Sequence, residues 1–82
     1  MSGRRDEALA IVGRVCARPV ESLRPEQTLA GDLEIDSVRG LDLLFTLEER
    51  LGISIDEPSA AGFRTLGDVL TYVERASGGG AG

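Results

Sequence analysis

Apolar residues recur at intervals of three and four along much of the chain, which is the spacing of one face of an α-helix. The first stretch with this pattern runs from Asp6 to about Arg18 and is followed by Pro19, which cannot continue a helix. Its apolar positions are Ala8, Leu9, Ile11, Val12, Val15 and Cys16. We therefore predict a first helix here, with Cys16 as a small core residue rather than a reactive thiol.

The strongest helix signal covers residues 38–51, a run without proline. Asp36 is a suitable N-cap before it, and Gly52 suits the left-handed conformation that follows many helix ends. On a helical wheel, one face of this helix collects Gly40, Leu43, Leu44, Leu47 and Leu51, and we predict that it is buried. Gly40 would permit a close approach to that face.

A second apolar stripe, formed by Val38, Leu41 and Phe45, lies roughly 130° away on the same wheel. Leu41 could be buried or exposed on this pattern. Phe45 lies between Asp42 and Glu49, so burying its ring deeply would draw ionised carboxylates toward the core. We predict a partly exposed Phe45, an apolar knob bordered by acids that suits transient docking to a basic partner. For the acids alone, a solvated helix face explains the pattern equally well.

The remaining segments predict a long loop and two further helices. Residues 19–35 contain two prolines and a glycine, and we expect this loop to be anchored by its scattered apolar residues Val20, Leu23, Leu29, Leu33 and Ile35. So long a loop is uncommon unless it is functional. Pro58 predicts a short helical turn over 58–61. Thr65 and Asp68 resemble a capping box at the start of a last helix that ends near Ala76. The glycine-rich residues 77–82 are expected to form a flexible tail, after a single domain over 1–76.

Composition narrows the classes of function. The 82 residues allow one small core, and aromatic residues make up 4% of them, so the core must be built from aliphatic side chains. The formal net charge of −5 disfavours nucleic acids and anionic membranes as partners and favours basic protein surfaces. The chain shows neither a membrane-spanning run nor a signal peptide, so we expect a cytoplasmic protein. We also expect a monomer.

Ser37, directly after the predicted N-cap, is the candidate functional residue. Its hydroxyl would lie at a helix N-terminus, where unpaired N–H groups tolerate a negatively charged substituent. The chain has no His and no Lys, so a Ser-His-Asp mechanism is excluded and an enzyme is not expected. The nearby acids Asp32, Glu34 and Asp36 lack the pattern of an EF-hand, and we expect no metal site. In isolation, an Asp-Ser before an apolar helix is more often an ordinary helix start than a site, so the context of Ser37 must decide.

The ordered series of motifs resembles the acyl carrier protein family. It comprises Thr28-Leu29, Asp32-Leu33, Ile35-Asp36-Ser37-Val38, Leu47-Glu48-Glu49-Arg50-Leu51-Gly52-Ile53-Ser54-Ile55 and Thr65-Leu66-Gly67-Asp68-Val69. The resemblance, which covers residues 6–76, implies an all-α four-helix bundle with a short third helix. It also implies that a separate phosphopantetheinyl transferase loads Ser37, beside Asp36, with 4'-phosphopantetheine from coenzyme A. Such a carrier presents thioester-bound acyl groups to acyltransferases, ketosynthases and other acyl-processing enzymes.

The resemblance further implies a partner-binding surface on the second helix. Its positions are Val38, Asp42, Phe45, Glu48 and Glu49, together with Arg39 beside them. Glu34, Val38 and Arg39 depart from the family pattern, in which Gly, Leu and an acid are common at these positions. A cation beside the docking surface would weaken attraction to a generic basic partner and favour a dedicated one.

For this reason we expect a carrier of specialised biosynthesis, such as polyketide assembly, rather than of housekeeping fatty acid synthesis. Asp36, in place of His, favours an acyl carrier over a peptidyl carrier of nonribosomal peptide assembly, although aminoacyl cargo and a non-carrier helical interaction module stay open as alternatives. The start at Met1 and the glycine-rich end favour a free-standing, type II carrier.

Overall fold

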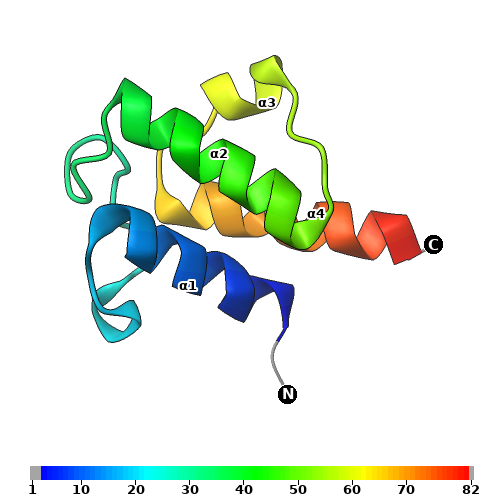
Figure 1. Ribbon diagram of the computed structural model, residues 1–82, viewed down its shortest axis with the longest axis horizontal. Coiled ribbons are helices and arrows are strands. Elements are labelled where there is room, and N and C mark those ends of the chain that lie inside the picture. The colour runs from blue at the N-terminus through cyan, green and yellow to red at the C-terminus, as the bar shows by residue number, and fades with distance from the viewer. Residues whose placement is uncertain (1–2, 82) are drawn as a thin grey trace.

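The computed structural model describes the backbone of residues 3–81 and the side chains of residues 3–76. Its elements are α1 (Arg4–Cys16), the 3-10 turn η1 (Val20–Ser22), α2 (Ser37–Leu51), α3 (Glu57–Ala61) and α4 (Leu66–Ala81) (Figure 1). No strand forms over residues 3–81, where Thr28 and Thr65 make an isolated antiparallel bridge. The expectation of an all-α four-helix bundle with a short third helix is confirmed.

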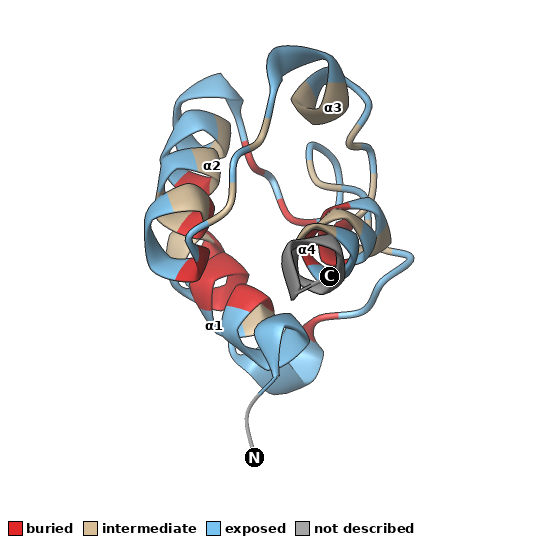
Figure 2. Ribbon diagram, turned by 90° about the vertical axis from the view of Figure 1, so that its right-hand side faces the viewer, coloured by how far each residue is buried: buried red, intermediate tan, exposed pale blue. Residues whose placement is uncertain are grey.

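The core lies between α1, α2 and α4, and the short α3 crosses outside it (Figures 1 and 2). Figure 2 shows the buried positions turned toward one another on the three long helices and on the end of the loop before α2. The buried side chains form one cluster, and none of them is polar or charged among the described residues. Its members are Ala8, Ile11, Val12, Cys16, Leu23, Leu33, Ile35, Leu43, Leu47, Leu51, Leu66, Val69, Leu70 and Val73.

Helix α1 begins and ends about two residues before the predicted bounds, at Arg4 and Cys16. The helix ends because Ala17 adopts the left-handed conformation with φ 58°, from which its N–H and that of Arg18 bond back to carbonyls of the last turn. The stop therefore precedes Pro19. Cys16 is buried, as predicted, and burial raises the pKa of its thiol.

The predicted capping box at the start of α4 is confirmed. Asp68 accepts hydrogen bonds from the N–H groups of Arg64 (2.9 Å) and Thr65 (3.1 Å), and Thr65 Oγ1 accepts from the Asp68 N–H (3.3 Å). Helix α4 continues to Ala81, beyond the end predicted near Ala76. The flexible tail predicted over 77–82 falls on residues whose side chains are not described and on Gly82, which lies outside the described residues, so it stays a prediction.

The Asp68 cap predicts an acid-dependent loss of stability. Hydrogen bonds from the Arg64 and Thr65 amides hold the pKa of the Asp68 carboxyl below its ordinary value of 3.8. Because the folded pKa is the lower one, this stabilisation is present above about pH 4 and is lost as the pH falls through the folded pKa. Asp68→Ala should lower the thermal midpoint at pH 7, and the gap to the wild type should close toward about pH 2. Glu26→Ala, at an exposed carboxylate, is the control, and a gap independent of pH would contradict the assignment.

Candidate functional site at the start of helix α2

Ser37 is the first residue of α2 and is exposed. The helix begins here because the Asp36 carboxylate accepts a hydrogen bond from the Arg39 N–H at 2.8 Å, which makes Asp36 the N-cap as predicted. In the described part of the chain the Ser37 hydroxyl has no hydrogen-bond partner, and the first turn of α2 contains no acidic residue. The hydroxyl is therefore free to take a substituent, and the helix end favours an anionic one.

The loop before α2 is fixed by its apolar residues and by its own hydrogen bonds. Leu33 and Ile35 are buried, and the Ile35 N–H donates to the Leu29 carbonyl at 2.8 Å. Thr28 and Asp32 bond reciprocally, each side chain accepting from the other's N–H at 2.9 Å. Leu23 is also buried, whereas Val20, which we expected to be an anchor, is 43% exposed because it lies on the outer turn η1. The loop thus sets the point at which the chain enters α2.

Glu34 has a positive φ of 55°, a conformation that favours glycine. It lies between the two buried residues Leu33 and Ile35. Its carboxylate lies 3.9 Å from the Arg18 guanidinium, an exposed ion pair. The departure from a family glycine noted in the sequence thus coincides with a strained backbone position.

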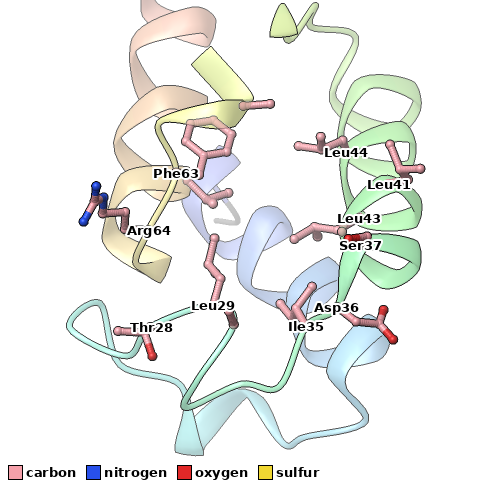
Figure 3. Close-up of a pocket in the computed structure, with 14 residues that line it drawn as sticks. Thr28, Leu29, Ile35, Asp36, Ser37, Leu41, Leu43, Leu44, Phe63 and Arg64 are labelled. Atoms are coloured by element: carbon pink, nitrogen blue, oxygen red, sulfur yellow. The ribbon is translucent and has the colours of Figure 1, made fainter. Parts of the chain in front are cut away.

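An open apolar groove of about 740 Å³ lies beside Ser37. Figure 3 shows Leu44 and Ile35 on one side and Phe63 and Leu29 on the other pointing into it, whereas the Asp36 carboxylate and the Arg64 guanidinium point away. Gly40 and Leu44, which we predicted on the buried face of α2, are half-buried and line this groove. The sequence did not reveal the groove, because its walls come from four separate stretches, within residues 28–30, 35–44 and 60–64 and at Val69.

The second stripe of α2 is exposed. Val38 is 75%, Leu41 56% and Phe45 64% exposed, whereas Leu43, Leu47 and Leu51 on the opposite face are buried. The question left open for Leu41 is thus resolved, and Phe45 is the exposed knob that we predicted. Contiguous exposed apolar side chains on a small protein indicate an interaction surface.

The charged residues that we assigned to this surface differ in their surroundings. Arg39, Asp42 and Glu49 are exposed. Glu48 is half-buried, and its Oε2 accepts a hydrogen bond from the Ile55 N–H at 2.8 Å. This contact joins α2 to the segment before α3, and no short-range sequence pattern indicated it.

Neither a metal site nor a membrane-spanning helix appears in the part of the chain that the structure describes. No three potential ligands among His, Cys, Asp and Glu come together there. None of its helices combines the length and the apolar character needed to cross a bilayer.

Comparison with known proteins identifies the family. The family model described as "Phosphopantetheine attachment site" matches residues 6–73. The chain belongs to the acyl carrier protein family. It is 31% identical to Acyl carrier protein 3 of Ralstonia nicotianae over 87% of this chain and 82% of that protein. It is 32% identical to the meromycolate extension acyl carrier protein of Mycobacterium leprae, covering 79% of this chain and 56% of the longer relative.

A solved structure agrees with the sequence comparison. The chain superimposes on a structure assigned as an acyl carrier protein from Mycobacterium tuberculosis with a TM-score of 0.82 and 28% identity, covering 88% of this chain and 96% of that one. Carriers of this family are not enzymes. They hold 4'-phosphopantetheine covalently, are modified by phosphopantetheinyl transferases and work with acyl-processing enzymes. The exposed Ser37 hydroxyl at the helix end fits the phosphate of this group.

Substitutions at Glu34 test the strain in the loop that leads to Ser37. A non-glycine residue in the left-handed conformation costs the folded state roughly 1–2 kcal/mol, and replacing it by glycine removes this cost. Glycine also raises the conformational entropy of the unfolded chain, which offsets part of the stabilisation. Glu34→Gly should therefore raise the free energy of unfolding by up to about 1 kcal/mol, and Glu34→Val should lower it. Urea denaturation measures both, with Arg18→Gln as the control for the ion pair. If Glu34→Val were more stable to unfolding than Glu34→Gly, residue 34 would not hold the left-handed conformation.

Proposed function

We propose that Ser37 is the attachment point of 4'-phosphopantetheine and that the chain presents acyl groups on this arm to partner enzymes. The observation that supports the proposal is the exposed, unpaired hydroxyl at the Asp36-capped N-terminus of α2, within the matched family region. When bound, the group supplies a terminal thiol that holds the cargo as a thioester. The protein's own contribution is to anchor the phosphate where the helix dipole tolerates its charge and to leave the arm accessible.

We further propose that partners dock on the exposed face of α2, next to the attachment point. Val38 and Phe45 supply apolar contact, whereas Arg39, Asp42 and Glu49 supply charges on the same outward side. Apolar contact fixes the fit and charges fix the orientation of approach. Glu48, the sixth residue that we assigned to docking, is engaged internally by the Ile55 N–H, which argues for a different role.

For the pathway, we propose a dedicated carrier of specialised acyl biosynthesis such as polyketide assembly. The mixed charge around Phe45, with Arg39 beside Asp42, suits a partner of matched charge better than a uniformly basic one. A second candidate, extension of long acyl chains, is favoured by the names of the meromycolate extension relatives. The mass of the cargo on the protein isolated from its native host distinguishes the two, and an aminoacyl cargo would contradict both.

Attachment at Ser37 is tested by loading the apo protein with coenzyme A and a broad-specificity phosphopantetheinyl transferase. Intact mass should rise by one phosphopantetheine in the wild type, because the Ser37 hydroxyl is exposed and unpaired. Ser37→Ala should show no gain. Ser54→Ala is the matched control, since Ser54 is also an exposed serine but lies in the segment between α2 and α3. A mass gain that persists in Ser37→Ala would place the group elsewhere.

The role of Phe45 is tested against the half-buried Phe63, which packs on the core. Phe45→Ala should slow loading under limiting transferase by about fivefold or more, since truncating an apolar anchor costs an interface at least about 1 kcal/mol. It should lower the free energy of unfolding by less than about 1 kcal/mol, because the ring is already exposed. Phe63→Ala should lower the free energy of unfolding by more than Phe45→Ala and should slow loading by less. A large stability loss with unchanged loading kinetics in Phe45→Ala would place the ring in the core.

A further inference from the structure

Helix α3 is held over the groove by few interactions. None of its residues is buried, and it is linked to α2 by residues 52–56. Phe63, just after α3, points into the groove from the side opposite Leu44 (Figure 3), and Ala60 of α3 also lines the groove, so the two form part of its wall. The position of this wall therefore depends on how the linking segment is anchored.

Two side chains anchor the linking segment from opposite sides. From α2, Glu48 Oε2 accepts the Ile55 N–H at 2.8 Å. From α4, the Tyr72 hydroxyl donates to the Ser54 carbonyl at 2.8 Å, and the Tyr72 ring meets Phe63 edge to face with centroids 5.6 Å apart. Within residues 53–56, all of which are described, the Ile55 N–H is the one backbone amide with a hydrogen-bond partner.

The Glu48 contact is the stronger anchor on physical grounds. A carboxylate is a better acceptor than a neutral group, and this one is partly buried, where water competes less for the Ile55 N–H. A partner that drew Glu48 outward would leave that N–H without its acceptor. The charge of Glu48 is thus committed inside the molecule, unlike the charges of Asp42 and Glu49.

We propose that Glu48 is a positioning residue that clasps the segment between α2 and α3 and so holds the Ala60–Phe63 wall of the groove beside Ser37. It acts through Ile55 and not through contact with a partner. The clasp belongs to the apo protein, so it does not depend on where the prosthetic group is attached. It nevertheless links the helix proposed for docking to the wall of the groove.

Amide hydrogen exchange measured by NMR on the apo protein tests the clasp. In the wild type, the Ile55 amide should exchange more slowly than those of Ser54 and Asp56. Glu48→Ala should speed Ile55 exchange by about tenfold or more and shift the amide signals of Ala60 and Phe63. Glu48→Gln should retain much of the protection, because its side-chain oxygen can still accept the bond. Glu49→Ala, at the exposed neighbouring acid, is the matched control and should leave Ile55 exchange unchanged.

The loading rate separates the clasp from docking. Glu48→Ala should retain the rate of loading by the phosphopantetheinyl transferase within about twofold, whereas Glu49→Ala should reduce it. A Glu48→Ala variant that slows loading as much as Glu49→Ala while Ile55 exchange and the Ala60 and Phe63 signals stay unchanged would overturn the proposal. If Glu48→Ala does not fold, the wild-type comparison decides, since equal exchange at Ile55, Ser54 and Asp56 would overturn it as well. An unchanged loading rate in Glu49→Ala would contradict the proposed docking role of Glu49 and would leave the Glu48 proposal unaffected.

Discussion

The packing of one apolar face of α2 against α1, in the core that both share with α4, is the constraint on which the rest of the molecule depends. Leu43, Leu47 and Leu51 are almost completely buried and fix the rotation of the helix about its axis. Because side chains follow one another at about 100° per residue, this rotation also turns Val38 and Phe45 outward. Leaving these two residues exposed is thus a direct consequence of satisfying the core.

The loop before α2 places the start of that helix at the cost of local strain. Glu34, between the buried residues Leu33 and Ile35, takes the left-handed conformation, which costs a non-glycine residue free energy. Asp36 then caps the helix, which begins at Ser37. The candidate attachment point is positioned by the buried Ile35 and the capped first turn of α2, although the Ser37 hydroxyl has no hydrogen-bond partner in the described part of the chain.

The acids of α2 have two different tasks. Asp42 and Glu49 are solvated and able to meet a partner, whereas Glu48 accepts a backbone N–H from the segment that leads to α3. Neighbouring acids on one helix therefore need not all face a partner, because one of them can accept a hydrogen bond from a backbone N–H elsewhere in the fold. The chain thus combines a helix whose outer face is exposed with a groove wall that has few anchors.

The sequence alone determined the helices, the Asp36 and Thr65–Asp68 caps, the two faces of α2 and the family, because these depend on residues close together in the chain or on motif order. It located the ends of α1 and α4 less well. For α1 the reason is that an alanine such as Ala17 does not indicate the left-handed conformation that ends the helix. Only the tertiary structure decided that Leu41 is exposed, that Val20 is not an anchor, that a groove lies beside Ser37 and that Glu48 binds Ile55. Each of these depends on segments distant in the sequence that meet in space, and a local pattern contains no information about which segments meet.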